Sequence, residues 1–371
     1  MTMSIRVALL CFAGLLIGAV LGGLVLGTAC GSDTNARPTA TPEPAATPTA
    51  FVAGTATPSA PIEYVRVAYI NLMSPIADGE GSVAWMTYGD RIDLTIANLD
   101  SFDADLVGFS EAAWVKGLEE NAWKRLQNGL ALEPSILARA NPWPFNTSQE
   151  ESDALVLREG YEEGEYLLSR YPILSSARYA LTRESVEEGR AVLHAVVKLP
   201  EPAGEVDVYV TRFAGPFKDA QAVSLLQIIT GTHQEERGLI VMGDFESDPG
   251  STVLTTIKDP GLHLEDAFEI AGPGHFTCCR ASVTAAAAPT TTETTEPATS
   301  EPDTGTPPAT EEPQQPSTIS TRWDYILAGQ WSTQSVTLLG DEPAPNPQGE
   351  LLYPSDHNGI GAVFYVGTAA Q

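Results

Sequence analysis

The chain has 371 residues and carries 20 lysines and arginines against 48 aspartates and glutamates, which gives a formal net charge of −28 at pH 7. Such an acidic surface argues against tight binding of long duplex nucleic acid, which needs a basic patch. The four cysteines, at positions 11, 30, 278 and 279, do not form the pattern of a disulfide-framework fold.

Residues 1–29 are typical of a secretory signal peptide. Arg6 supplies a positive charge, and the stretch from Val7 to Leu26 is almost wholly apolar. Small residues before Cys30 and polar residues after it resemble a bacterial lipoprotein signal, in which the cysteine receives the lipid, although Leu26 lies one position further from Cys30 than usual. The alternative is an uncleaved membrane helix, since about 20 apolar residues can span a bilayer. Both interpretations predict a protein on the extracytoplasmic face of the cell membrane.

Two stretches of low complexity accompany the predicted domain. Residues 30–60 are rich in Thr, Pro and Ala and cannot bury a core, which predicts an extended stalk between the membrane and the domain. Residues 283–318 contain neither lysine nor arginine and show no apolar periodicity, which predicts a disordered insertion. We therefore expect one folded domain over 61–371, interrupted by that insertion.

The predicted domain mixes strands and helices. In chain order we expect strands at 64–72, 103–111, 164–173, 189–197 and 206–213, and helices at 88–101 and 220–232. A further buried strand begins at Leu239, while residues 115–150 look helical and then loop-like and show no site. The steady alternation of a parallel sheet is missing, so we predict an α+β fold in which two mixed, mainly antiparallel sheets are flanked by helices in a four-layer sandwich.

Polar side chains stand where three of the predicted strands end. Asn71 ends the first strand, Glu111 ends the second, and Asp244 follows the apolar run that begins at Leu239. A carboxylate or an amide held at the edge of a sheet can meet a divalent cation or a reacting phosphate. Each of these residues alone is equally typical of a surface turn, so the interpretation depends on the whole set.

Seven short motifs follow one another along the predicted domain. They are the strands ending in Asn71 and Glu111, Leu-Ser-Arg-Tyr-Pro-Ile at 168–173, Gly-Arg-Ala-Val at 189–192, Gly-Asp-Phe at 243–245, Arg-Trp-Asp-Tyr-Ile at 322–326 and Ser-Asp-His at 355–357. In number and order they resemble the endonuclease/exonuclease/phosphatase superfamily, which includes deoxyribonuclease I and sphingomyelinases. Thr-Cys-Cys at 277–279 is also similar to secreted bacterial members.

The resemblance implies a metal-dependent phosphoesterase that acts on a phosphodiester or a phosphomonoester, with nucleic acid, a phospholipid headgroup and a small phosphate as open alternatives. Glu111, Asn71 and Asp356 would hold Mg²⁺, with Mn²⁺ as a substitute. Asp244 would orient or deprotonate the attacking water. His357 would contact the scissile phosphate, with its tautomer fixed by Asp324. We expect such a protein to act as a monomer.

Four further predictions concern phosphate contacts and two departures from the family pattern. Asn71 and Arg190 would contact the phosphate, although Arg190 could instead close a surface ion pair. Arg212 replaces the histidine that many members carry; it keeps a positive charge but cannot act as an acid near neutral pH, and we expect it to pair with Glu165. Glu246 replaces an asparagine: it binds a second cation, is protonated and donates as an acid, or no longer allows phosphate to bind.

The predicted function is an extracytoplasmic phosphoesterase, and the alternative is a catalytically degenerate member that acts as a surface binding protein. The substitutions at Arg212 and Glu246 favour the alternative, whereas the other predicted site residues favour the enzyme. Cys278 and Cys279 form a vicinal disulfide or remain free thiols. Two adjacent cysteines without other soft ligands are not expected to bind a metal.

Overall fold

The computed structural model describes residues 60–76, 78–118, 121–182, 188–270, 276–285 and 319–367. The predicted signal peptide, Cys30 and the stalk up to residue 59 lie outside these ranges, as does the predicted insertion from residue 286 onward. Residues 283–285, which were expected to belong to the insertion, instead join the fold: Val283 is buried and Thr284 forms a β-bridge with Leu352. Within the described ranges, no helix has the length and apolarity that crossing a bilayer requires.

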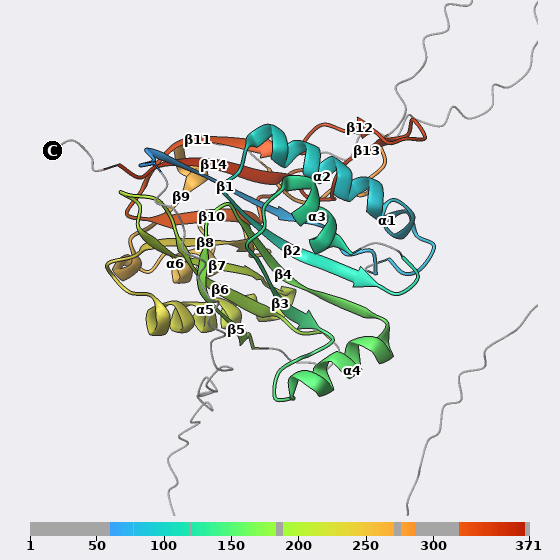
Figure 1. The fold of residues 1–371 in the computed structure, drawn as a ribbon, viewed down its shortest axis with the longest axis horizontal. Helices are drawn as coiled ribbons and strands as arrows, with labels where there is room; N and C mark the ends of the chain where they lie inside the picture. Colours follow the sequence, from blue (N-terminus) through green and yellow to red (C-terminus); the bar gives the residue numbers. More distant parts are fainter. Residues whose placement is uncertain are drawn as a thin grey trace, which may run out of the picture. The chain divides into compact units, whose positions relative to one another are not determined.

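Two six-stranded sheets form the centre of the domain (Figure 1). The first sheet contains β1 (Tyr64–Asn71), β2 (Leu106–Val115), β3 (Ser135–Asn141), β4 (Tyr161–Ser169), β11 (Ser332–Leu339) and β14 (Gly359–Tyr365). The second contains β5 (Ile173–Ala180), β6 (Ala191–Lys198), β7 (Glu205–Arg212), β8 (Gly238–Asp244), β9 (Leu264–Asp266) and β10 (Asp324–Gly329). The short strands β12 (Ala344–Pro345) and β13 (Leu351–Leu352) pair separately.

Each sheet has one parallel pair near its middle. The strand order is β11-β14-β1-β2-β4-β3 in the first sheet and β5-β6-β7-β8-β10-β9 in the second. Strands β1 and β2 are parallel, as are β7 and β8, whereas the other neighbours in these two described sheets are antiparallel. The predicted fold class, two mixed and mainly antiparallel sheets, is confirmed.

Helices cover the outer face of each sheet (Figure 1). The α-helices are α1 (Val83–Met86), α2 (Tyr88–Phe102), α3 (Ala122–Leu130), α4 (Gln149–Glu159), α5 (Lys218–Thr232) and α6 (Thr252–Ile257). Short 3₁₀ turns occupy η1 (Gly215–Phe217), η2 (Pro260–Leu262) and η3 (Ala267–Ile270). Helices α2 and α3 pack on the first sheet, and α5 and α6 pack on the second, which gives four layers.

The alternation of side chains along β1 shows how one strand serves two cores. Val65, Val67 and Tyr69 point into the core between the sheets, whereas Ala68 and Ile70 point into the core beneath α2 and α3. Burying one such aliphatic side chain completely contributes about 1.5–3 kcal/mol. Because both faces of β1 are buried, its end is held firmly at the edge of the sheet.

Strand β3 lies within 115–150, where the sequence predicted no strand. It is an edge strand of the first sheet, and Arg139 interrupts its apolar pattern. The Arg139 guanidinium bonds to Glu162 of β4 and to Ser152 and Asp153 of α4. The strand is therefore stabilised by partners distant in sequence, which a local pattern cannot indicate.

Gly243 allows β7 and β8 to approach closely beside the end of β8. A Cβ atom at this position would lie 2.2 Å from the carbonyl oxygen of Thr211, which is backbone and cannot swing away. By contrast, a Cβ atom on Gly231, within α5, would meet nothing within 4 Å. Of these two positions, only Gly243 therefore requires a residue without a side chain.

We expect Gly243→Ala to lower the free energy of unfolding by about 1–3 kcal/mol, because the added methyl group overpacks the contact between β7 and β8. Gly231→Ala is the matched control and should leave the stability unchanged or raise it by up to ~1 kcal/mol, since alanine is the better helix former. Urea denaturation followed by circular dichroism measures both. Equal stabilities of the two variants would contradict this account of the strand contact.

Candidate active site

The two parallel pairs bring distant parts of the sequence to one edge of the sandwich. Asn71 is the last residue of β1, and Arg212 and Asp244 are the last residues of β7 and β8. The register places Asn71 beside Ser110 and Arg212 beside Asp244, while Asp324 begins β10 opposite Asp244. The Asn71 amide reaches from the first sheet to the second, because its Nδ2 donates to Asp244 Oδ2 at 3.1 Å. The strand ends of both sheets therefore build one cluster.

Glu111 is aimed into this cluster by an irregularity in β2. The pairing of β2 with β4 shifts between Phe109 and Ala112, and Glu111 has φ 57°, a left-handed value that is uncommon for a residue other than glycine. Its Oε1 accepts from Asn71 Nδ2 at 2.9 Å, and its Oε2 accepts from the Ser74 backbone N–H at 2.7 Å. The bulge thus sets the direction of the carboxylate, and two donors fix it.

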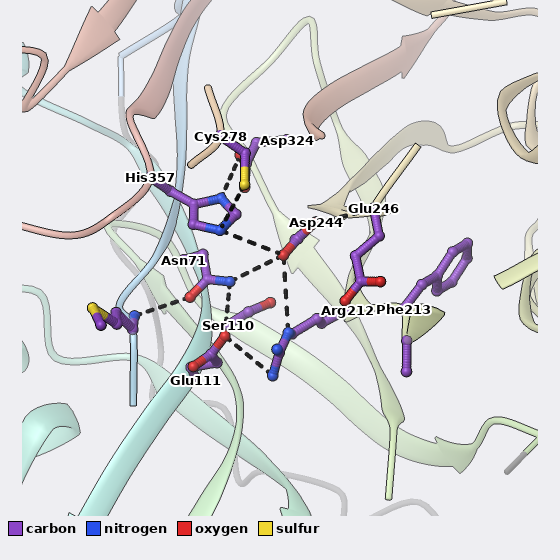
Figure 2. Close-up of polar contacts among 12 residues, drawn as sticks. Asn71, Ser110, Glu111, Arg212, Phe213, Asp244, Glu246, Cys278, Asp324 and His357 are labelled. Atoms are coloured by element: carbon purple, nitrogen blue, oxygen red, sulfur yellow. Dashed lines mark hydrogen bonds and ion pairs between the residues drawn. The ribbon is translucent and has the colours of Figure 1, made fainter. Parts of the chain in front are cut away.

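Arg212 pairs with Glu111 and not with Glu165, so the predicted Arg212–Glu165 ion pair is wrong. Its Nη1 lies 3.1 Å from Glu111 Oε1, and its Nε lies 3.9 Å from Asp244 Oδ2 (Figure 2). Burial by itself raises the pKa of Glu111, but the charge of Arg212 and the bonds from Ser74 and Asn71 outweigh it and lower that pKa to about 2. Glu111 is therefore ionised at any ordinary pH.

Glu165 lies behind this ion pair and forms a buried chain with two hydroxyl groups. Tyr69 donates to Ser110 Oγ at 2.7 Å, and Ser110 Oγ donates to Glu165 Oε2. Burial raises the pKa of Glu165 to about 8, although Ser110 and the charge of Arg212 act in the opposite direction. Glu165 thus bonds to the Ser110 hydroxyl, while Arg212 pairs with Glu111.

His357 and Asp324 form the predicted dyad. His357 Nδ1 lies 2.8 Å from Asp324 Oδ2, and both side chains are buried. The Ser355 hydroxyl accepts from the His357 backbone N–H at 3.1 Å, so the Ser-Asp-His turn fixes the backbone position from which the His357 side chain extends. The other ring nitrogen, Nε2, lies 3.9 Å from Asp244 Oδ2. Figure 2 shows the ring between Asp324 on one side and Asp244 on the other.

The carboxylates around His357 keep it positively charged. Burial alone lowers the pKa of His357, but the charge and hydrogen bond of Asp324, together with the charges of Asp244 and Asp356, raise it to about 10. For Asp244 the balance is reversed: burial and the charge of Asp324 raise its pKa, while His357 and Arg212 oppose them. The pair therefore holds a fixed cation next to a carboxylate that accepts a proton more readily than an exposed aspartate.

Two other predicted residues, Asn71 and Arg190, have hydrogen-bond partners of their own. Asn71 Oδ1 accepts from the Met73 backbone N–H at 3.0 Å, so both ends of its amide are engaged by the protein. Arg190 is buried, donates to the Phe213 carbonyl at 3.2 Å, and pairs with Glu188 at 2.7 Å. That pair is the alternative that the sequence left open for Arg190. Contact of either residue with phosphate stays a prediction.

Glu246 turns its carboxylate toward the start of η1. Its Oε2 accepts from the Gly215 backbone N–H at 2.6 Å, and its own backbone N–H donates to Asp244 Oδ1 at 3.0 Å. Burial, with the charge of Asp244, raises the pKa of Glu246. This shift does not choose among its three predicted states, and the catalytic role of Glu246 stays a prediction.

Comparison with known proteins places the chain in a family. Residues 83–357 match the profile described as the Endonuclease/Exonuclease/phosphatase family. The chain belongs to this family. Its members are hydrolases that act on phosphoester bonds, so the chain carries the fold of a phosphoesterase or nuclease. No curated protein matches the sequence.

Solved structures agree with the family assignment at the level of the fold. A family protein from Bacteroides vulgatus is 19% identical with a TM-score of 0.54, covering 82% of this chain and 99% of that one. A mannosyl-6-phosphatase from Bacteroides thetaiotaomicron is 15% identical with a TM-score of 0.53, covering 80% and 98%. The catalytic domain of human Nocturnin, with bound sulfate, is 15% identical with a TM-score of 0.53, covering 81% and 93%.

Enzymes of this family depend on divalent metals, and the cluster has the chemistry to hold one. Its donors are hard carboxylate oxygens, and burial together with the charge of a neighbouring carboxylate raises the pKa of Asp356 as it does that of Asp244. Asp324 Oδ1 is buried without a hydrogen-bond partner among the described residues. These features fit a cation, while the guanidinium of Arg212 beside Glu111 opposes one.

Three side chains of the cluster lie close enough together to hold one ion. Asp244, Asp324 and His357 offer ligand atoms within 4.8 Å of one another. Among the described residues, Glu111 and Asp356 belong to no such group of histidine, cysteine and acidic side chains, so the predicted metal set of Glu111, Asn71 and Asp356 stays a prediction.

Sequence reasoning missed several residues that shape the cluster. The Ser74 N–H and the Ser110 hydroxyl have no signature in the sequence, because each acts through one hydrogen bond to a distant carboxylate. Cys278 and Cys279 were noticed, but their place beside His357 was not. The Thr-Cys-Cys motif, which contains both cysteines, is the only signal in the sequence that marks them.

Glu165→Gln should flatten the pH dependence of stability. The carboxyl pKa is raised from 4.5 to about 8 on folding, so Glu165 contributes stability that is fully present below pH 4.5 and is lost as the pH rises through 8. Glutamine stays neutral and keeps an acceptor for Ser110. The variant should therefore be more stable than the parent at pH 9 and similar to it at pH 5.

Chemical denaturation between pH 5 and 9 tests this expectation. Glu133→Gln, which changes an exposed carboxylate, is the matched control and should keep the slope of the parent. Parallel stability curves for the parent and Glu165→Gln would show that Glu165 is ionised in the folded protein.

Proposed function

We propose that this protein is an extracytoplasmic, divalent-metal-dependent phosphoesterase. The observation that carries the proposal is the position of Asp244, whose Oδ2 faces Asn71, Arg212 and His357 at once. A carboxylate that adjoins two cationic side chains at the end of a rigid strand suits the activation of water beside an anionic phosphate. Membership of a phosphoesterase family supports the same chemistry.

In this proposal each side chain of the cluster has a separate role in the reaction. Asp244 orients the attacking water and accepts its proton, for which its raised pKa is favourable. His357, held by Asp324, keeps its positive charge and stabilises the charge that develops on the phosphoryl oxygens. Arg212 adds a second fixed positive charge, and Glu246, when protonated, donates to a phosphate oxygen.

Glu111, with Asp356 and Asn71, would hold the metal at the neighbouring strand ends. When bound, Mg²⁺ supplies charge relief on the phosphoryl oxygens, and Mn²⁺ provides the same chemistry. For Asn71 to contribute its Oδ1, its bond from the Met73 N–H must be given up. Arg190 lies behind the cluster and would reach phosphate only after releasing Glu188.

The substrate that we propose is a small phosphate ester. The net charge of −28 disfavours a long polyanion. A mannosyl-6-phosphatase is among the similar folds, which agrees with a small phosphate ester, whereas another similar fold is in complex with a single-strand DNA product. We further propose that Cys30 carries the lipid anchor that attaches a monomer to the membrane surface; this residue lies outside the described ranges.

The first test is hydrolysis of bis-p-nitrophenyl phosphate by the full chain with Mg²⁺ or Mn²⁺ and with a chelator. We expect metal-dependent turnover, and a loss of roughly 100-fold or more in kcat for Asp244→Asn and for His357→Ala, because each removes a group that acts on the reacting atoms. His263→Asn, which changes an exposed histidine outside the cluster, is the control and should keep full activity.

Unchanged turnover in both Asp244→Asn and His357→Ala would contradict the roles that we propose for these two residues. An absence of turnover against a panel of phosphate esters, together with retained phosphate binding, would favour the degenerate surface binding protein. The arrangement of Arg212 against Glu111 is the observation that keeps this alternative in view. Phosphate binding is measured by calorimetry, so the two functions are separated by different experiments.

Arg212→Gln should strengthen binding of Mg²⁺. The guanidinium competes with a cation for Glu111, so its removal should lower the Mg²⁺ dissociation constant by roughly tenfold, which corresponds to about 1.4 kcal/mol. Calorimetry measures this directly and needs no turnover. Arg66→Gln, which removes an exposed arginine paired with Asp103, is the matched control. Equal Mg²⁺ binding by Arg212→Gln would show that Arg212 does not compete with the metal, and weaker binding would show that it assists the metal site.

A further inference from the structure

Two cysteine sulfurs lie directly beside the ring of His357. Cys278 Sγ is 3.4 Å and Cys279 Sγ is 3.6 Å from His357 Nε2. The two cysteines are joined by a disulfide. Figure 2 shows the Cys278 sulfur beside the ring, while the same Nε2 faces Asp244. The ring nitrogen that would meet the substrate therefore also meets both sulfurs.

Backbone hydrogen bonds hold the cysteine segment in place on two sides. The Cys278 N–H donates to the Thr321 carbonyl at 3.0 Å, just before β10. On the other side the Asn358 N–H donates to the Thr277 carbonyl at 2.7 Å, and the Arg280 N–H donates to the Asp356 carbonyl at 2.8 Å. These bonds involve no sulfur, so they keep Cys278 and Cys279 near His357 whether or not the disulfide is intact.

The disulfide is open to attack from one end. Cys278 is buried, whereas Cys279 is exposed. A dithiol reductant attacks the exposed sulfur as a thiolate, the S–S bond breaks, and a mixed disulfide forms. The second thiol of the reductant then displaces Cys279. The reductant becomes a cyclic disulfide, and the two electrons and two protons it gives up convert the protein disulfide into two thiols.

We propose that reduction of the Cys278–Cys279 disulfide creates a binding site for the borderline-soft divalent cation Zn²⁺. The Cys278 and Cys279 thiolates and His357 Nε2 would hold the ion. Their ligand atoms already lie within 4.8 Å of one another. Two thiolates and an imidazole are a preferred ligand set for Zn²⁺, and a fourth position stays open to water. Binding releases the two thiol protons and the proton on Nε2 to solvent.

His357 supplies the third soft ligand that two adjacent cysteines lack. It lies 79 residues from Cys278 in the sequence and reaches it through the fold. The hard carboxylates nearby suit a different ion, so the two sites select different cations. A zinc-bound His357 is no longer free to face phosphate. Reduced, zinc-loaded protein is therefore switched off, a consequence that rests on the proposed function.

Cobalt is a spectroscopic stand-in for zinc and tests the site without any turnover. The full chain carrying Cys11→Ser and Cys30→Ser is reduced with dithiothreitol, freed of the reductant without air, and titrated with Co²⁺. We expect a near-ultraviolet thiolate-to-cobalt band that saturates at one Co²⁺ per chain and is displaced by Zn²⁺. The same protein with its disulfide intact should show no such band. A reduced protein without the band would overturn the proposal.

Single substitutions identify the ligands. Cys279→Ser, at an exposed position, should weaken Co²⁺ binding at least tenfold and reduce the thiolate band. His357→Gln should weaken binding by a similar factor while keeping the band, because both thiolates remain. His263→Asn is the matched control and should bind as the parent does. Unchanged affinity in either ligand variant would remove that residue from the site and overturn the three-ligand proposal.

Turnover of bis-p-nitrophenyl phosphate then tests the switch. Zn²⁺ at one equivalent should inhibit the reduced protein at least tenfold and leave the oxidised protein unaffected. Full activity of reduced protein whose cobalt spectrum confirms binding would overturn the switch. An absence of turnover in every state would contradict the proposed function instead, and the cobalt titration would still decide the zinc site.

Discussion

The buried negative charge at the shared edge of the two sheets is the constraint on which the site depends. Glu111, Asp244 and Asp324 are nearly inaccessible to solvent, and an unpaired buried carboxylate costs several kcal/mol. Arg212 and protonated His357 oppose this charge from the two sides of Asp244. Arg212 and His357 therefore stabilise the buried carboxylates in addition to the chemical roles that we propose for them. We expect a substitution at either residue to affect folding as well as reactivity.

Topology explains why this charge gathers at one edge. Parallel neighbours have their carboxyl ends on the same side, and each sheet has one such pair, which delivers Asn71 and Arg212 from opposite sheets. The antiparallel strands β10 and β14 begin where β8 and β1 end, which adds Asp324 and His357. Apolar side chains on both faces of these strands hold the ends rigid, so that packing remote from the site sets its geometry.

The sequence predicted the positions that strand ends determine and failed where a contact depends on a neighbouring strand. Asn71 and Asp244 each follow an apolar run, and the dyad of His357 and Asp324 follows from the family resemblance. The predicted partner of Arg212 was wrong, because Glu165 bonds to Ser110 and Arg212 pairs with Glu111. The left-handed conformation of Glu111 and the meeting of Cys278 with His357 have no local signal, since both arise from packing between distant segments.

Replacing a histidine by Arg212 also limits where protons can move. A guanidinium stays charged at every accessible pH, so Arg212 can neutralise an anion but cannot pass a proton to a leaving oxygen. In the proposed reaction that task would pass to Glu246, just beyond the end of β8, because burial raises its pKa and Asp244 is assigned to the attacking water. Where the family pattern has a histidine that can transfer a proton, this chain would therefore present a fixed charge, and proton transfer would depend on the neighbouring carboxyl group.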